Sequence, residues 1–118
     1  MPTSQRQAGA QWPQRVTGQH IQLTGWITAT TRPAPGHSAS FEAVVVPERP
    51  SPGQRLEASK AGELVVLIWL GQHHVAGIHP GATLRFSGPV SRREGRDVIF
   101  NPRYEVIEAA PDRTDKES

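Results

Sequence analysis

The chain has 118 residues, a formal net charge of +2 and no cysteine. This length supplies one modest hydrophobic core, which excludes a second domain, and the lack of cysteine excludes disulfides and thiolate metal sites. No apolar run approaches the roughly 18 residues of a membrane-spanning helix, and the N-terminus lacks the apolar segment of a secretory signal. We therefore expect a cytoplasmic protein with no membrane association.

The two ends of the chain are poor in apolar residues. Residues 1–15 are rich in Gln, Ser, Thr and Gly and are expected to form a flexible arm, in which Trp12 is the one aromatic side chain that could dock on the domain. Residues 111–118 are expected to form a disordered polar tail. A single domain is predicted between them, over residues 16–110.

The first half of this domain has the patterns of β-strands. Ile21, Leu23 and Ile27 alternate with polar residues, and Gly25 among them permits the bulge or sharp coil that a small barrel needs. Ser40–Val46 is a second β-branched run. Three prolines and two glycines then fall within residues 47–62, which predicts a long excursion before the next strand.

The second half predicts three more strands. Leu64–Leu70 is apolar on both faces, and the connector over residues 71–81 holds at most a turn or two of helix because it contains glycine and proline. Residues 83–90 alternate again, and a charged turn leads to a return strand that must break at Pro102, which cannot donate to a ladder. Five strands with one short helical or turn connector between the third and fourth predict an all-β OB-fold, a Greek-key barrel.

Four segments also carry a resemblance to a known family: Val66–Gln72, Gly77–Gly81, Ser87–Val90 and Ile99–Glu105. They resemble small actinobacterial OB-fold nucleic-acid-binding proteins, are similar to the OB wedge domain of RecG-type branch-migration helicases, and are more distantly similar to anticodon-binding OB domains. The resemblance covers residues 16–107 and implies a five-stranded barrel with a role in nucleic-acid binding. Fold alone does not fix function.

Arginines dominate the predicted binding site. Arg92, Arg93 and Arg96 fall in the turn between the last two strands, one of the two loops with which OB domains bind oligonucleotides. The alternative is a solvated hairpin tip whose charges pair locally. Arg85 and Arg103 either extend this patch or pair with Glu105. A further arginine, Arg32, lies in the first loop, from which it could complete a clamp.

Aromatic residues are the other means by which OB domains hold single strands. Alternation places Trp26 on the polar side of its strand, where it could stack a base, unless a bulge at Gly25 turns it into the core. Trp69 is expected in the core, and the alternative is a stacking platform on the binding surface. Phe41, Phe86 and Phe100 are assigned inward, structural positions, and Tyr104 is expected near the barrel edge, packed or within reach of phosphate.

The remaining patterns indicate no chemistry. His73, His74 and His79 have no carboxylate within their segment, so no metal site is predicted, and no catalytic arrangement or phosphate-binding loop is present, so neither an enzyme nor a cofactor is expected. The sequence predicts a binding module for single-stranded or irregular DNA or RNA. The alternative is a protein-interaction domain, with a protein partner or a second copy of the chain, which is favoured by the low net charge.

Overall fold

A computed structural model describes residues 12–32, 39–49 and 64–111, and it contains seven β-strands and no helix within those ranges. The strands are β1 (His20–Thr31), β2 (Ser40–Val46), β3 (Val65–Leu70), β4 (Thr83–Pro89), β5 (Ser91–Arg93), β6 (Arg96–Phe100) and β7 (Arg103–Glu108). The predicted all-β class is confirmed. The connector over residues 71–81 is built from turns. No helix in the described part of the chain is long and apolar enough to span a membrane.

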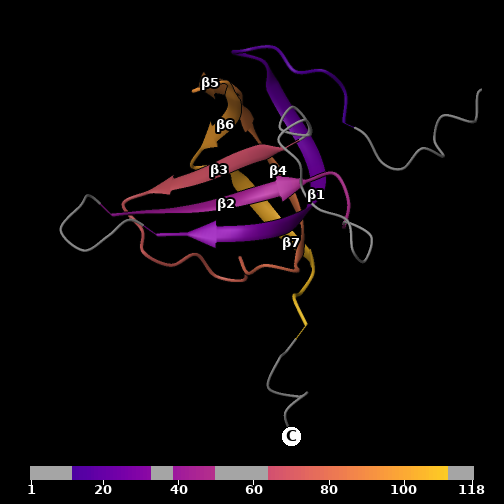
Figure 1. Ribbon diagram of the computed structural model, residues 1–118, viewed down its shortest axis with the longest axis vertical. Helices are drawn as coiled ribbons and strands as arrows, with labels where there is room; N and C mark the ends of the chain where they lie inside the picture. Colours follow the sequence, from indigo (N-terminus) through magenta and orange to yellow (C-terminus); the bar gives the residue numbers. More distant parts are fainter. Residues whose placement is uncertain (1–11, 33–38, 50–63, 112–118) are drawn as a thin grey trace, which may run out of the picture.

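The strands form one mixed sheet in the order β5-β6-β3-β2-β1-β4-β7 (Figure 1). All neighbours are antiparallel except β3 and β6, which are parallel. The sheet is not closed by hydrogen bonds into a barrel, because β5 and β7 form its two edges. There are seven strands where the sequence predicted five, because β5 lies in the segment predicted to be a charged turn and the last predicted strand is divided at Pro102 into β6 and β7.

Specific backbone contacts mark both strand boundaries. Val90, the one residue between β4 and β5, donates its N–H to the Gln19 carbonyl at 2.9 Å and accepts the Gly18 N–H at 2.7 Å. Asn101 has a φ of 48°, donates its N–H to the Ile68 carbonyl at 2.6 Å and accepts the Leu70 N–H on its side-chain oxygen at 2.9 Å. Pro102 follows without an N–H. The predicted break at Pro102 therefore ends β6 and lets β7 pair with β4.

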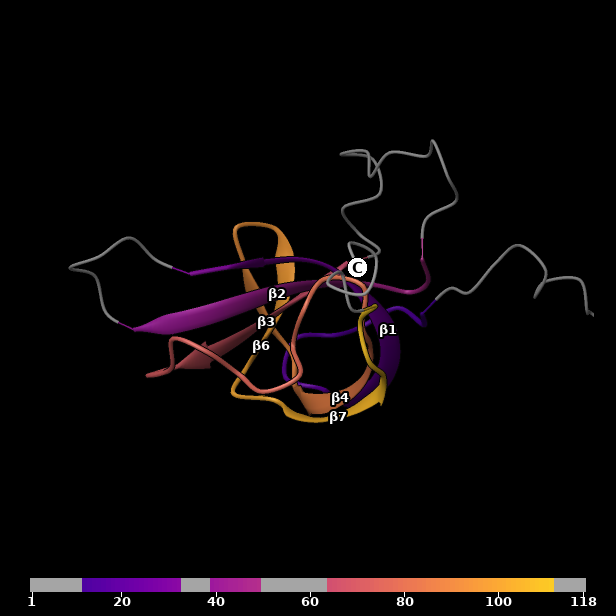
Figure 2. The ribbon, with the colours of Figure 1, turned by 90° about the horizontal axis from the view of Figure 1, so that it is seen from below.

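The first strand changes partner along its length. β1 pairs with β4 over residues 20–26 and with β2 over residues 26–31, so Trp26 belongs to both ladders. In Figure 2, β1 follows one arc with β4 and β7. Gly25 lies at this corner, where an added Cβ would come within 2.6 Å of the Trp12 ring, Val45 and the Val46 carbonyl. The register shift falls between Ile27 and Ala29 instead, so the bulge considered at Gly25 is not there.

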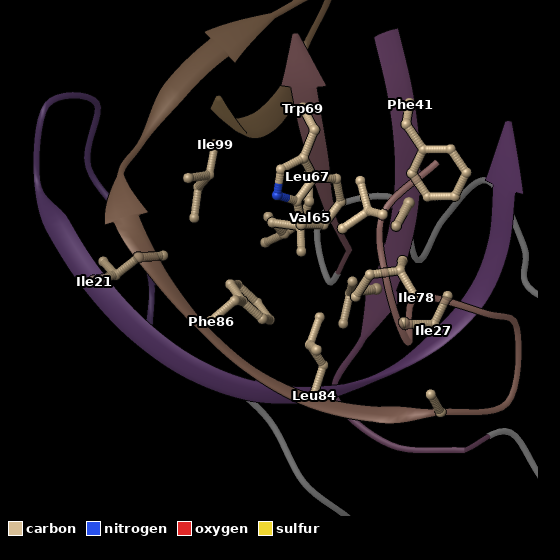
Figure 3. Close-up of a cluster of buried hydrophobic side chains, with 14 of the residues drawn as sticks. Ile21, Ile27, Phe41, Val65, Leu67, Trp69, Ile78, Leu84, Phe86 and Ile99 are labelled. Atoms are coloured by element: carbon tan, nitrogen blue, oxygen red, sulfur yellow. The ribbon is translucent and has the colours of Figure 1, made fainter. Parts of the chain in front are cut away.

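The core fills the concave side of the curved sheet (Figure 3). Val65, Leu67 and Trp69 point inward from β3, and Phe86 points inward from β4. Trp69 is 4% exposed and lies edge-on to Tyr104 with ring centroids 5.6 Å apart, so its prediction as a core residue is confirmed. Alternate residues of the same strands lie on the opposite side of the sheet.

The described chain begins with a segment packed on the domain. The Trp12 indole donates to the Thr24 carbonyl at 3.0 Å and packs edge-on against Phe86, with ring centroids 6.0 Å apart. Arg15 lies over the Trp12 ring. Trp12 and Arg15, which fall in the predicted arm, are therefore packed on the domain. The other residues of the predicted arm, the predicted tail from residue 112 and most of the predicted excursion lie outside the described residues.

Candidate functional site

The turn between β5 and β6 decides which way its arginines face. Glu94 and Gly95 form a two-residue turn with φ values of 54° and 78°, the geometry whose twist matches that of a hairpin. Arg92 pairs directly with Asp97, and Arg93 pairs with Arg96. Directly paired residues share a face and adjacent ones do not. Arg92 is thus on one side of the hairpin, and Arg93 and Arg96 are on the other.

Arg92 belongs to a partly buried ion cluster that the sequence did not predict. Asp97 is 8% exposed and binds two guanidinium groups, Arg92 Nη2 at 2.8 Å and Arg15 Nε at 2.6 Å. The Arg15 side chain is itself only 6% exposed. We call Arg15, Arg92 and Asp97 the Asp97 cluster; it borders a hollow of about 350 Å³ that Trp12 also lines. The cluster joins the segment before β1 to the last hairpin.

Arg93 and Arg96 lie on the opposite side, together with Val98 and Phe100. The Arg93 guanidinium lies over the Phe100 ring, 5.4 Å from its centroid. Both arginines are exposed, and neither forms an ion pair with a described residue. Phe100 is half-buried on this side, so its predicted inward position is wrong, whereas Phe41 and Phe86 are buried in the core as predicted.

The side of the hairpin that carries Arg93, Arg96 and Phe100 is part of a larger surface. This surface is the convex side of β1, β2, β3 and β6, which we call the outer face. Pairing places residues in rows across the four strands. One row is Thr31, Glu42, Ile68 and Phe100, and the next is Ala29, Val44, Val66 and Val98. The first row is polar at one end and aromatic at the other, and the second is aliphatic.

Trp26 lies on the same outer face, opposite Val46. Because the register shift comes only after Ile27, alternation holds through Gly25, and Trp26 keeps the side of Gln22 and Thr24. Of the two interpretations left open by the sequence, the outward one is confirmed. The indole is half-buried and lines a hollow of about 320 Å³.

Arg32 follows the far end of β1 and is exposed. Its neighbour Thr31 pairs with Glu42, whereas the arginine turn adjoins Asp97, which pairs with Val65. These places are separated by roughly 10 Å along β2 and by about 14 Å across three strand spacings. Arg32 therefore borders the outer face at the end remote from the arginine turn.

Arg85, Arg103 and Tyr104 lie on β4 and β7, away from the arginine turn. Arg85 binds Glu105 at 2.8 Å, with both side chains largely exposed, so for Arg85 the predicted alternative of local pairing is confirmed. Arg103 is exposed opposite Ser87 and makes no ion pair within the described residues. The Tyr104 hydroxyl donates to the Ala76 carbonyl at 2.8 Å, so this ring ties the connector to the core.

Two features were missed in the sequence for different reasons. The Arg15 to Asp97 pair joins residues 82 positions apart, and no local pattern marks it. Phe100 ends the apolar run Val98–Phe100, in which every residue is apolar and the side facing the core is not evident. The alternation of Arg96, Val98 and Phe100 is the signal that could have placed it.

Comparison of the chain with models of known protein families, with curated proteins and with solved structures found no match. Within the described residues there is no group of three or more His, Cys, Asp or Glu side chains placed to hold a metal ion. The candidate site is the outer face itself, with two half-buried aromatic residues and two arginines without ion-pair partners in the described chain. Of the aliphatic row between them, Val66 and Val98 are buried, Val44 is half-buried and Ala29 is exposed.

Proposed function

We propose that this chain is an OB-type domain that binds single-stranded or irregular nucleic acid, without catalysis, through its outer face. The observation that carries the proposal is the combination on one face of Trp26, Phe100, Arg93 and Arg96. Single-strand binders combine aromatic rings on which bases stack with cations that follow the phosphates. The other place where an aromatic ring lies beside cations, the hollow lined by Trp12, Arg15 and Arg92, has both of these arginines bound to Asp97.

The topology supports the OB assignment. β1, β2 and β3 form an antiparallel meander, β4 adds to the free edge of β1, and β6 lies parallel to β3. If β4 with β5 and β6 with β7 are each counted as one bent strand, the order is that of a five-stranded, partly open Greek-key barrel. The β2 and β3 surface and the last hairpin are where such domains bind oligonucleotides.

Arg93 is placed to act as a stacking platform. Its guanidinium lies over Phe100, which restrains the plane of the group. Bases stack on arginine planes as well as on aromatic rings, and the face turned away from Phe100 is the one open to a base. Arg96, paired with Arg93 across the turn, lies beside it as a phosphate partner.

The strength of binding should be modest and dependent on salt. Arg93, Arg96 and Arg32 border the outer face and have no ion-pair partner among the described residues. Three phosphate contacts on a single strand give a slope of about −2 in the plot of log affinity against log salt. We expect binding that is measurable at low ionic strength and an affinity that falls with added salt along this slope.

Fluorescence anisotropy of labelled single-stranded DNA, single-stranded RNA and duplex DNA, each over a salt series, tests the proposal. Saturable binding of a single strand with the stated slope, and weaker binding of the duplex, is the expected result. The absence of saturable binding to any strand at low ionic strength would contradict the proposal.

One observation favours a second candidate function, association with another protein chain through the same face. Val44 and Ile68 are half-buried on the outer face, and Leu70 beside them is 52% exposed. Sedimentation velocity over a concentration range, with Leu70→Lys as the matched variant, would reveal self-association. A dimer that forms in the wild type and is lost in this variant would favour a protein interface over a nucleic-acid interface.

A further inference from the structure

A hollow of about 320 Å³ lies at the corner where β1 passes from β4 to β2. Trp26 lines it from β1, Thr83 from β4 and Glu108 from β7, and Arg49 borders it just after β2. Register places the first three in one row, since Trp26 pairs with Thr83 and Thr83 pairs with Glu108. The row spans roughly 10 Å from β1 to β7.

A register shift sets the direction of Glu108. Tyr104 and Val106 point toward the core from β7, so regular alternation would also turn residue 108 inward. The pairing of β4 with β7 shifts between Thr83 and Leu84, and Glu108 is thereby brought opposite Thr83, on the side of Trp26. Bulges commonly re-aim side chains beside binding sites.

Three charged residues line this hollow, Glu48, Arg49 and Glu108. Within the described residues, neither Glu108 nor Arg49 forms an ion pair, and both are exposed. The half-buried indole between them presents an apolar surface beside a carboxylate and a guanidinium. The hollow thus offers a stacking surface, an acceptor of two hydrogen bonds and a cation.

We infer that this hollow is a subsite for one guanine base, stacked on Trp26, with its edge on Glu108 and its phosphate at Arg49. The inference rests on the proposed function and names the base that one part of the interface selects. A carboxylate offers only acceptors, which can take two parallel hydrogen bonds. It therefore fits a base whose edge presents two adjacent donors.

Guanine alone among the common bases has that edge, with the ring N1–H next to the exocyclic N2 amino group. Adenine and cytosine each present one amino group beside a ring nitrogen acceptor, which a carboxylate repels. Uracil and thymine present one N–H between two carbonyl oxygens. A well-placed bidentate contact discriminates between bases by roughly 5- to 150-fold, and we expect about tenfold at this exposed site.

The test uses short thymidine oligomers that differ only in one central base, guanine, adenine or cytosine. Affinity for each is measured by anisotropy with the wild type and with Glu108→Gln. Glu105→Gln is the matched control, because Glu105 is on the same strand, exposed, and bound to Arg85 outside the hollow. Trp26→Phe reports which part of the tryptophan quenching comes from the hollow.

The wild type and Glu105→Gln are expected to favour the guanine oligomer by about tenfold, with quenching that is absent in Trp26→Phe. In Glu108→Gln the preference should fall to near parity while the thymidine background is unchanged. Equal binding of the three oligomers by the wild type would overturn the guanine subsite and leave the proposed function intact. A lack of binding to every oligomer at low salt would overturn both.

Discussion

Arg92 and Arg93 are adjacent in the sequence, yet one belongs to the Asp97 cluster and the other to the outer face. In the cluster, the Asp97 carboxylate is buried and both of its oxygens bind a guanidinium. On the outer face, Arg93 rests on an aromatic ring and has no carboxylate partner in the described chain. The arginines of this hairpin therefore do not form one site. Alternation along the strand puts Arg92 in the Asp97 cluster and Arg93 on the outer face.

The largest loss of stability is expected from a substitution in the buried Asp97 cluster. Asp97→Ala leaves the Arg15 guanidinium without its carboxylate, and we expect the free energy of unfolding to fall by about 3 kcal/mol. Urea denaturation measures it. Glu105→Ala removes a carboxylate from an exposed pair and should cost less than about 1 kcal/mol. Equal losses in the two variants would mean that the Asp97 cluster contributes no more than a surface pair.

A second variant tests the inner and outer sides of β1 at the corner. Gly25→Ala adds a Cβ within 2.6 Å of the Trp12 ring, Val45 and the Val46 carbonyl, so we expect a loss of about 1 to 3 kcal/mol. Thr24→Val changes the adjacent, exposed position and should stay within about 0.5 kcal/mol. Thermal unfolding of both separates the two sides, and a neutral Gly25→Ala would contradict the close packing at this corner.

A third variant acts on binding. Trp26→Leu removes a stacking surface, and we expect affinity for single strands to fall by roughly 5- to 150-fold, corresponding to about 1 to 3 kcal/mol. Trp26→Phe should retain much of the affinity because a ring remains. Anisotropy titration measures both. An unchanged affinity in Trp26→Leu would remove this corner from the interface.

The smallest effect concerns the exposed member of the Asp97 cluster. The Arg92 side chain is 48% exposed, and Asp97 keeps Arg15 when Arg92 is neutralised. Arg92→Gln should therefore cost no more than about 1 kcal/mol in urea denaturation. If the loss equals that of Asp97→Ala, Arg92 and not Arg15 is the main partner of the carboxylate.

Local patterns predicted much of the sheet. The β-branched run Ser40–Val46 coincides with β2, and the apolar run Leu64–Leu70 gives β3 within one residue. Pro102 marked a break because it lacks an N–H. The short strand β5 was not predicted, since it lies in the charged segment that was predicted to be a turn.

The candidate site was less accessible to sequence analysis than the strands were. Trp26 was placed by alternation once the bulge proved to lie after Ile27. Arg92, Arg93 and Arg96 were grouped together because the sequence does not show the length or register of the turn, which places Arg92 opposite Asp97. The contact of Arg15 with Asp97 and the pairing of Glu108 with Thr83 join residues far apart in the sequence, so local sequence patterns do not reveal them.

We propose that the outer face binds nucleic acid with Arg93 and Arg96 and without Arg92. The most direct test is the salt dependence of single-strand affinity for the double variant Arg93→Gln/Arg96→Gln against Arg92→Gln, both compared with the wild type. The double variant should bind more weakly and its slope should become shallower by about 1.4, the value for two lost phosphate contacts, while Arg92→Gln keeps the wild-type slope. An equal loss in both variants, or no loss in the double variant, would contradict the claim.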